Sequence, residues 1–431
     1  MLGFSSRSQT LLEMNEGKQQ RPRRAVILEP GATGHRPTYV RWIAKGFLAS
    51  AIPVAVVGPS ELLQHPDLAG LAAGNGATAA RFVQIAAPET RAARNSRLAL
   101  WHNERALRSW YGAAHRAASP QADTDLVIVP YLDNCFHAIA ALGSPFAATE
   151  WCGITMRTEF PNSGERETTP ARTALLARIL AQKGLRTLWS IDPRSHAYAG
   201  DRGVDGGPKW HKLRYLPDPS DMAASQTRHD ARRSLSLSDE SNVVLLYGSI
   251  DPRKGLEELL RGAASLSNTR KWTIIIAGQQ TAEGADIVSR WSARAHAIGF
   301  ELRALASRID SSLTATLFAA ADVIWTGYPN HKGMSGVLVQ AAFCGKPVIG
   351  HCSGLVGELL RSSGIGVSCD VNAPREVSAA LESAVDPRLA ELAQLNGPRF
   401  FMQHRPEEFG HRLASVLECQ DAAATTACAT Q

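Results

Sequence analysis

The sequence predicts an α/β protein made of two successive doubly wound units, each a parallel sheet covered by helices. Its 431 residues allow two or three domains. With 44% hydrophobic and 20% charged residues, the chain can bury packed cores, which excludes global disorder. Short apolar runs alternate with helical patterns along most of the chain, and this alternation is typical of parallel strands joined by helices.

The first α/β series begins at Ala25, after a polar and uneven N-terminal stretch. Its apolar runs have the length of buried strands, and its longer segments have a helical period. The strands are expected at residues 25–30, 54–58, 81–87 and 125–132, and the helices after Pro37 and over residues 97–118.

The second α/β series begins at Asn242 and repeats the same alternation. Its strands are expected at residues 242–248, 272–278, 321–327, 347–350 and 366–370. Its helices are expected at residues 256–266, 285–298, 311–320, 336–344 and 355–361, with a last one opened by Pro374.

A proline-rich linker separates the two series. Pro217 and Pro219 exclude a helix within residues 212–222. Ligands of open α/β sheets bind beyond the carboxyl ends of the strands, so we expect the active site in a cleft between the two domains. The predicted organisation is a flexible segment (1–24), a first domain (25–216), a second domain (217–398), a crossing helix (399–419) that returns to brace the first domain, and a flexible tail (420–431).

The composition excludes several other classes of protein. The seven cysteines form no CxxC pair and make an odd number, which disfavours a disulfide scaffold and a zinc ribbon. No run of eighteen apolar residues without charge is present. The N-terminus lacks the apolar core of a secretory signal, so we expect a cytoplasmic protein.

The positive charge is concentrated in the first half of the chain. The formal net charge of +6 divides into +9 for residues 1–215 and −3 for the remainder. Such a surface suits phosphorylated substrates, or peripheral contact with the anionic inner face of a membrane. The basic residues are scattered without an aromatic platform between them, so no nucleic-acid partner is expected.

The strongest candidate site lies in residues 328–350. A strand is expected to end near Trp325, and a loop of small residues then leads into a helix that stops at Gly345. The amides at such a helix start, here Gly336 to Leu338, can bind a diphosphate, whose negative charge the helix dipole favours. Gln340 lies one turn further on, within reach of a ribose attached to that diphosphate. A plain tight turn followed by an ordinary helical glutamine is the alternative.

A second candidate site is the loop within YGSIDPRKGLEELL, residues 247–260. Arg253 and Lys254 are expected to project from the carboxyl end of a strand, where their charges would stabilise a departing diphosphate. Lys254 is the first choice. The alternative is a pair of solvated cations before a helix.

A third candidate is the glycine turn within residues 29–42. Gly31 and Gly34 allow close approach of the backbone to a ligand, and Pro37 suits the start of a helix. His35 and Arg36 are expected to point into the cleft. A dinucleotide fingerprint would need GxGxxG and an acidic residue about twenty positions later, so a nicotinamide enzyme is disfavoured.

The first domain also offers residues for an acceptor hydroxyl. Asp133 and His137 are spaced i, i+4 and would share one face of a helix. Either could accept the hydroxyl proton, although a capping Asp133 and a packed His137 explain the pattern equally well. Asp123 and Asp125 form a DxD pair, but they precede their strand, so we interpret them as a turn and expect no metal site.

Together these motifs resemble the GT-B retaining glycosyltransferases of the family 4 type. The similarity implies two Rossmann-like domains facing a central cleft. It also implies transfer of a sugar from a UDP- or GDP-type nucleotide sugar to a hydroxyl, with retained anomeric configuration and no metal or cofactor. Lys254 and the amides near Gly336 would hold the leaving diphosphate, and the base would lie against residues 306–309. The similar segments are residues 248–255, 318–328, 333–349 and 353–367, with weaker similarity at 34–42 and 214–222.

This resemblance, with the motifs above, gives two sets of expected site residues. The donor-binding set is Gly34, Ser249, Ser307, Arg308, Ile309, His331, Lys332, Gly333, Met334, Ser335, Gly336, Val337, Leu338 and Gln340. The catalytic set is Lys254, Arg253, His35, His137 and Asp133.

Three positions depart from the family pattern. Many members carry two glutamates spaced E-x7-E, where this chain has Lys332 and Gln340, and many carry an arginine where this chain has Ser249. Gln340 keeps the ability to hydrogen-bond a ribose. Lys332 reverses the charge that faces the donor sugar. Arg253 is expected to take the place of the arginine that is missing at Ser249.

We therefore predict a glycosyltransferase of bacterial glycan or glycoconjugate synthesis, whose acceptor is a glycan, a lipid-linked molecule or a small molecule. Two alternatives remain open. A sugar-nucleotide epimerase on the same plan would need no acceptor. An inactive sugar-nucleotide-binding partner would fit the changes at Ser249, Lys332 and Gln340.

Overall fold

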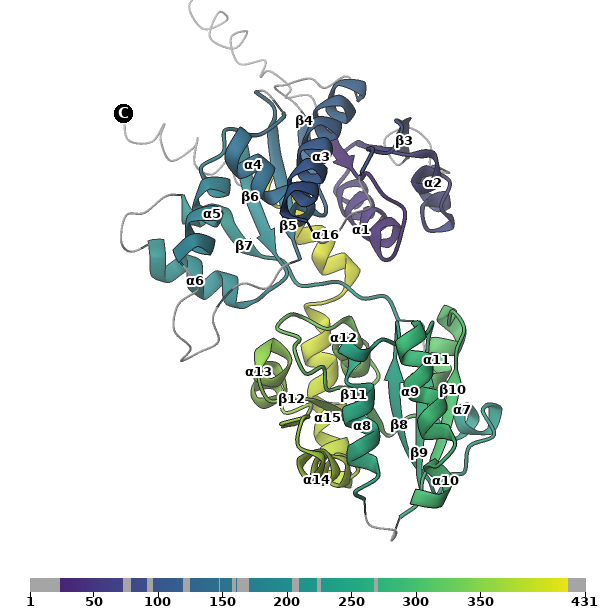
Figure 1. The fold of residues 1–431 in the computed structure, drawn as a ribbon. Coiled ribbons are helices and arrows are strands. Elements are labelled where there is room, and N and C mark those ends of the chain that lie inside the picture. The colour runs from purple at the N-terminus through teal and green to yellow at the C-terminus, as the bar shows by residue number, and fades with distance from the viewer. Residues whose placement is uncertain are drawn as a thin grey trace, which may run out of the picture.

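The computed structural model contains two parallel sheets in separate domains, each sheet covered by helices (Figure 1). The structure describes residues 24–72, 79–90, 96–118, 125–146, 148–156, 160, 170–203, 209–222, 226–266 and 270–417. Almost all of the two expected flexible tails, and Asp123 of the DxD pair, lie outside these residues. Across the described part of the chain, no helix is long and apolar enough to cross a membrane.

The first sheet has seven strands in the order β3-β2-β1-β4-β5-β6-β7, and every paired neighbour is parallel. Its strands are β1 (Arg24–Leu28), β2 (Val54–Gly58), β3 (Ala80–Gln84), β4 (Asp125–Val129), β5 (Glu150–Thr155), β6 (Leu185–Ser190) and β7 (Leu213–Tyr215). Its helices are α1 (Arg36–Ala49), α2 (Ser60–Leu63), η2 (Pro66–Leu71), α3 (Arg97–Ala117), η4 (Leu132–Cys135), α4 (Phe136–Leu142), α5 (Pro170–Leu180), α6 (Arg194–Gly203) and η5 (Trp210–Lys212).

The second sheet has six parallel strands in the order β10-β9-β8-β11-β12-β13. Its strands are β8 (Asn242–Tyr247), β9 (Trp272–Ala277), β10 (Glu301–Leu305), β11 (Val323–Thr326), β12 (Val348–His351) and β13 (Gly366–Cys369). Its helices are α7 (Arg228–Ser234), η6 (Pro252–Lys254), α8 (Leu256–Ala263), α9 (Ala282–Ser292), α10 (Ala295–Ile298), α11 (Ser311–Ala320), α12 (Gly336–Phe343), α13 (Gly354–Ser363) and α14 (Pro374–Ala384), followed by α15 (Pro387–Met402) and α16 (Pro406–Ala414).

Burial explains why these residues form strands and helices. All residues of β2 and β4 are buried, as expected for strands covered on both faces. In α8 the buried side chains Leu256, Leu259, Leu260 and Ala263 recur at helical spacing, so this helix presents one apolar stripe to the sheet.

Both sheets change winding direction beside their first strand. In the first sheet the reversal lies between β1 and β4, and in the second it lies between β8 and β11. The connections that leave these strands go to opposite sides and open a crevice at the carboxyl edge, where ligands of doubly wound folds bind. The loops after these four strands are therefore the ones that position a site.

The predicted α/β architecture is confirmed, with local differences. Strands β5, β6, β7 and β10 were not predicted, and the expected helix over 285–298 is divided into α9 and α10. Arg294, between these two helices, has a φ of −125°, which interrupts the helical backbone. Asp133 lies in the 3-10 turn η4 and His137 lies in α4, so they do not share one regular helix.

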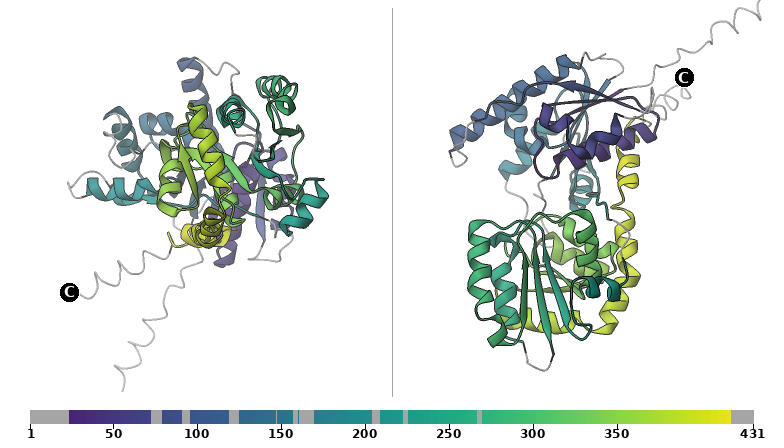
Figure 2. Two further views of the ribbon diagram at one scale, coloured as in Figure 1. Left: turned by 90° about the horizontal axis from the view of Figure 1, so that it is seen from below. Right: turned by 90° about the vertical axis from the view of Figure 1, so that its right-hand side faces the viewer.

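The last helix returns to the first domain and packs against α1 (Figure 2, right). The two helices approach closely, since a Cβ added to Gly46 would lie 2.4 Å from the Cα of Gly410. Within the expected crossing helix (399–419), it is therefore α16 that contacts the first domain. The second domain is expected to end at residue 398, but this residue lies inside helix α15. The helix ends at Met402, and α16 begins at Pro406.

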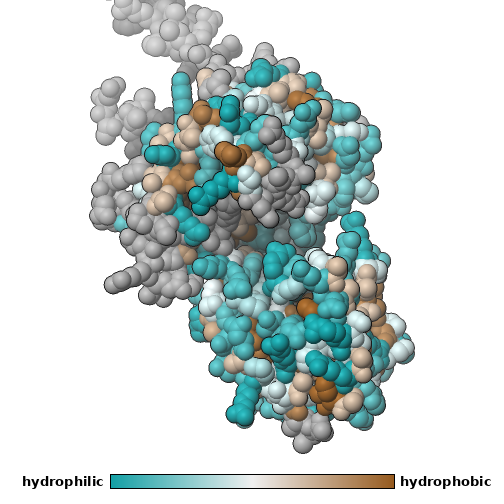
Figure 3. Space-filling view, viewed as in Figure 1, coloured by the Kyte–Doolittle hydropathy of each residue, from teal (hydrophilic) through white to brown (hydrophobic). Residues whose placement is uncertain are grey.

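The outgoing linker and the returning chain are hydrogen-bonded to each other. The imidazole of His404 donates to the carbonyl of Asp218 (2.8 Å), and the Ser220 amide donates to the carbonyl of His404 (3.0 Å). Trp42 of α1 donates its indole N–H to Asp221 (3.0 Å). The chain therefore crosses between the domains twice, and the two crossings are hydrogen-bonded to each other. In the view of Figure 3 the surface is indented between the two domains.

Candidate active site between the domains

The start of α12 presents open backbone at the carboxyl edge of the second sheet. Ser335, the N-cap residue, has extended backbone (φ −119°, ψ 117°), and its side chain makes no capping hydrogen bond. The Leu338 amide donates to the Ser335 carbonyl (3.0 Å), so of the three amides expected to bind the diphosphate only those of Gly336 and Val337 have no intrahelical acceptor. Gly336 is exposed, and a Cβ added to it would meet no atom within 4 Å. No side chain therefore fills the space in front of Gly336.

Lys254 follows β8, and its side chain extends to the loop that follows β11. Its Nζ lies 3.3 Å from the hydroxyl of Tyr328 and 4.4 Å from the centroid of the Tyr328 ring, a cation–π arrangement. Its carbonyl accepts a hydrogen bond from the indole N–H of Trp325 (3.0 Å). Two neighbouring strand ends therefore hold this ammonium beside the loop that leads into α12.

Gly255 makes this close approach of the two loops possible. It has a φ of +66°, and a Cβ added to it would lie 2.0 Å from the carbonyl oxygen of Gly327. A side chain here would push the turn that carries Lys254 away from the end of β11.

His331 shapes the loop before α12 in its neutral form. Its Nε2 lies 3.0 Å from the carbonyl oxygen of Met334, and a carbonyl only accepts, so Nε2 carries the hydrogen. The ring packs edge-on against Tyr328, with 5.5 Å between centroids. Burial lowers the pKa of His331, and the charges of Lys254 and Arg253 lower it further, against the hydrogen bond to Met334.

The structure places Arg253 away from the role expected for it. Its side chain is 89% exposed and makes two hydrogen bonds to Asp251, at 3.1 and 2.8 Å. Asp251 is the N-cap of η6, so this pair closes the turn before Lys254. Arg253 therefore does not stand in for the missing arginine at Ser249, which is itself exposed at the end of β8.

The remaining donor-side candidates occupy neighbouring loops and helices of the second domain. The Oε1 atom of Gln340 is buried and has no hydrogen-bond partner among the described residues. Lys332 is exposed, whereas Gly333 and Met334 are buried. Ser307 and Arg308 are exposed between β10 and α11, and Ile309 packs partly against the core.

At the glycine turn of the first domain, the structure turns Arg36 back onto Glu29. Glu29 is fully buried after β1, accepts the Gly31 amide (2.9 Å) and is hydrogen-bonded to Arg36. Burial raises the pKa of Glu29 to about 7, against the opposing effect of Arg36. The expectation that Arg36 points into the cleft was wrong. His35 is exposed, and Gly34 has a φ of +66° with no atom within 4 Å of an added Cβ.

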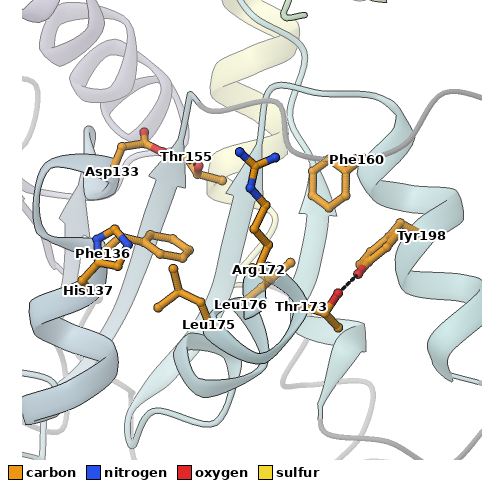
Figure 4. A pocket seen from close by; sticks show the side chains of 10 residues that line it. All are labelled: Asp133, Phe136, His137, Thr155, Phe160, Arg172, Thr173, Leu175, Leu176 and Tyr198. Atoms are coloured by element: carbon orange, nitrogen blue, oxygen red, sulfur yellow. Dashed lines mark hydrogen bonds between the residues drawn. The ribbon is translucent and has the colours of Figure 1, made fainter. Parts of the chain in front are cut away.

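Asp133 and His137 line one cavity of about 220 Å³ at the carboxyl ends of β4 and β5 (Figure 4). Both carboxylate oxygens of Asp133 are engaged, one by the Thr155 hydroxyl (2.6 Å) and one by the Met156 amide (2.7 Å). The Nδ1 of His137 lies 2.8 Å from Glu104. Since a carboxylate accepts, the neutral His137 holds its hydrogen on Nδ1 and leaves Nε2 as an acceptor. The remaining lining residues are Phe136, Phe160, Arg172, Thr173, Leu175, Leu176 and Tyr198.

The DxD motif does not contribute to this edge. Asp125 is the first residue of β4, at the opposite end of the strand, and pairs with Arg24 at 2.6 Å. Within the described ranges, no group of three or more His, Cys, Asp or Glu side chains could hold a metal ion.

Several residues of these sites were not predicted. The sequence analysis assigns no role to Tyr328, although an aromatic residue two positions after a strand end can contact a cation from the neighbouring strand end. Glu29 lies within the predicted strand 25–30, and the sequence does not indicate that it pairs with Arg36. Asp192 and Arg194 follow β6, a strand that the sequence does not predict.

Known proteins resemble this chain in sequence and in fold. Residues 227–396 match the family model "Glycosyl transferases group 1". The D-inositol 3-phosphate glycosyltransferase of Salinispora tropica is 27% identical over 220 residues, which are 49% of this chain and 43% of that protein. The enzyme of the same name from Mycobacterium leprae is 33% identical over 137 residues, 31% of each chain. The matched segments thus span less than half of these relatives.

Solved structures match over nearly the whole chain. Sucrose-phosphate synthase from Thermosynechococcus elongatus has a TM-score of 0.65 at 17% identity, covering 93% of this chain and 100% of its own. Anabaena HepE in complex with UDP and glucose has a TM-score of 0.62 at 15% identity, covering 92% and 100%. The fold is therefore that of the GT-B glycosyltransferases. Residues 227–396 are similar to the group 1 glycosyl transferases, which agrees with the family resemblance in the second domain.

Proposed function

We propose that this chain transfers a sugar from a nucleoside-diphosphate sugar to an acceptor hydroxyl, with retention of anomeric configuration. The observation that carries the proposal is the position of Lys254, whose ammonium lies against Tyr328 in the loop that leads to the open start of α12. A cation and unpaired amides near one another suit a diphosphate leaving group.

In this proposal the second domain stabilises the charge that develops as the sugar–phosphate bond breaks. Lys254 and the first amides of α12 would hold the diphosphate, and such preorganised donors supply a large part of catalysis in group transfer. We expect no requirement for an added metal, because these groups supply the positive charge. Gln340, with its unpaired buried oxygen, would receive a hydroxyl of the ribose.

The donor is proposed to be of the UDP type, with GDP as the alternative base. The Anabaena protein with the same fold was solved with UDP and with UDP-glucose, which makes uridine nucleotides the first to test. The curated relatives are named for D-inositol 3-phosphate, which favours a small molecule among the acceptor classes.

The acceptor is proposed to enter from the first domain, at the cavity beside His137. Each carboxylate oxygen of Asp133 already accepts one hydrogen bond, so in this proposal Asp133 positions Thr155 and does not act as the base. His137 keeps Nε2 as an acceptor, and its side chain is 51% exposed. It is therefore the better candidate to orient the acceptor hydroxyl.

Binding and turnover of candidate donors test this proposal. UDP, GDP and UDP-glucose are titrated by calorimetry, and release of UDP from UDP-glucose is then followed with and without sugar phosphates as acceptors. Binding of a nucleotide with acceptor-dependent release is expected. Binding without release would indicate an inactive sugar-nucleotide-binding protein, an isomer formed from donor alone would indicate an epimerase, and absence of nucleotide binding would contradict the proposal.

A further inference from the structure

We infer that Arg194 of the first domain is a positioning residue for the proposed donor site of the second domain. Its Nη2 donates to the backbone carbonyl of Lys332 at 3.3 Å, across the interface between the domains. Lys332 lies in the loop between β11 and α12, three residues before the N-cap Ser335. The inference rests on the proposed function, because that loop leads into the proposed diphosphate site.

Arg194 is held rigidly before it reaches the other domain. It is the first residue of α6, and its Nε lies 2.9 and 3.2 Å from the two carboxylate oxygens of Asp192, while its Nη2 lies 2.7 Å from one of them. The Asp192 carboxylate is fully buried, and the Arg194 side chain is 10% exposed. A fork of this kind orients the guanidinium plane, so little side-chain entropy is lost when it contacts Lys332.

The loop that Arg194 contacts is fixed within its own domain by a few contacts. The Leu355 amide also donates to the Lys332 carbonyl (3.3 Å), and a Cβ added to Gly354 would lie 2.7 Å from the carbonyl oxygen of His331. The loop therefore lies directly on the start of α13. Arg194 supplies a second donor to the Lys332 carbonyl, and a carbonyl oxygen has two lone pairs to accept them.

Fixing this carbonyl has a consequence for the helix start. The peptide of Lys332 sets the direction in which the chain enters Ser335, and therefore the direction of the Gly336 and Val337 amides. Because Arg194 belongs to the other domain, the orientation of the diphosphate site depends on the approach of the two domains. Donor affinity is thus expected to fall when the Arg194 contact is removed, even though every residue of the second domain is retained.

A double variant tests this without leaving a buried charge unpaired. Arg194→Ala alone would strand the carboxylate of Asp192 and endanger folding, so Asp192→Asn combined with Arg194→Met is used. Arg194→Lys serves as the conservative variant, because it keeps the charge but loses the fork. Arg186→Gln is the matched control, since Arg186 lies on β6 and pairs with Glu150 at 3.2 Å. Thermal unfolding of each full-length variant reports on folding.

The readouts are the Kd of UDP or GDP, whichever binds the unmodified chain, and the KM and kcat of the matching sugar nucleotide. The double variant should raise Kd and KM by about tenfold, the lower end of the range for a lost hydrogen bond to a charged group. The kcat of the double variant should change by less than about threefold. The Kd and KM of Arg194→Lys should lie between those of the unmodified chain and those of the double variant. All three constants of Arg186→Gln should match those of the unmodified chain.

Three outcomes would overturn the inference. The first is a folded double variant whose Kd is unchanged, and the second is a fall in kcat alone. The third is an unmodified chain that binds neither nucleotide, which would overturn the proposed function as well. The first two leave the proposed function intact, so the two failures are distinguishable.

Discussion

The ammonium of Lys254 lies over the ring of Tyr328, 4.4 Å from its centroid and 3.3 Å from its hydroxyl. The two residues follow β8 and β11, the strands on either side of the winding reversal in the second sheet. An ammonium has three N–H donors, and Tyr328 accepts one of them, so the others can bind a ligand. This pair therefore marks the place where an anion is expected beside α12.

Replacing Lys254 by Ala should lower turnover about ten- to a thousandfold, because one preorganised positive group beside the leaving diphosphate is lost. Release of UDP from the donor measures this. Thermal stability should stay close to that of the unmodified chain, since the hydrogen bond from Trp325 uses the backbone carbonyl of residue 254. Lys271→Ala is the control, because this side chain is 71% exposed and pairs with Glu240 at the other end of the sheet. Equal turnover in both variants would remove Lys254 from the mechanism.

Replacing Gly336 by Ala should separate binding from stability. The added methyl group meets no protein atom within 4 Å, and alanine is a better helix former than glycine, so the chain should be at least as stable as before. The same methyl group would occupy space in front of the helix start and weaken UDP binding by about tenfold, or 1.4 kcal/mol. Calorimetry and thermal unfolding measure the two effects. Unchanged UDP affinity would place the diphosphate elsewhere.

The contact between α1 and α16 predicts a stability effect at Gly46. A Cβ there would lie 2.4 Å from the Cα of Gly410, so Gly46→Ala should force the helices apart and destabilise the chain by about 1–3 kcal/mol. Thermal denaturation compares it with Gly70→Ala, whose added methyl group meets no atom within 4 Å. If both variants unfold at the same temperature, the returning helix does not brace the first domain in this way.

His404 predicts a loss of stability in acid. Burial lowers its pKa to about 4, from an ordinary value of 6.5, against a hydrogen bond to the Asp218 carbonyl. Between these values the folded state binds fewer protons than the unfolded chain. The contribution of His404 to the free energy of unfolding is therefore fully present above about pH 6.5. It is lost as the pH falls to about 4, and the loss is up to about 3 kcal/mol.

His404→Gln tests this, since its amide can still donate to Asp218 but does not titrate. The difference in unfolding free energy between the two chains should shrink or reverse from pH 7 to pH 4.5. A difference that is the same at both pH values would show that His404 does not titrate in this window.

The sequence predicts the second domain better than the first for a physical reason. Strands such as β8 and β9 are continuous apolar runs bounded by glycine, whereas β5 and β6 begin with or contain charged residues and β7 has only three residues. Their pattern is set by neighbours in the sheet, not by local preference. Pairs of residues that meet only in the folded chain could not be predicted either. Glu29 and Arg36 are seven residues apart, but nothing in the turn between them indicates that they pair. Arg194 and Lys332 are 138 residues apart, and nothing near either residue indicates the other.

The most direct test of the central claim is a crystal structure of the unmodified chain grown with UDP. We predict that the diphosphate lies within hydrogen-bond distance of the Gly336 amide and of the Lys254 ammonium. A diphosphate bound away from the start of α12, or a Lys254 side chain turned away from the diphosphate, would contradict the proposed donor site.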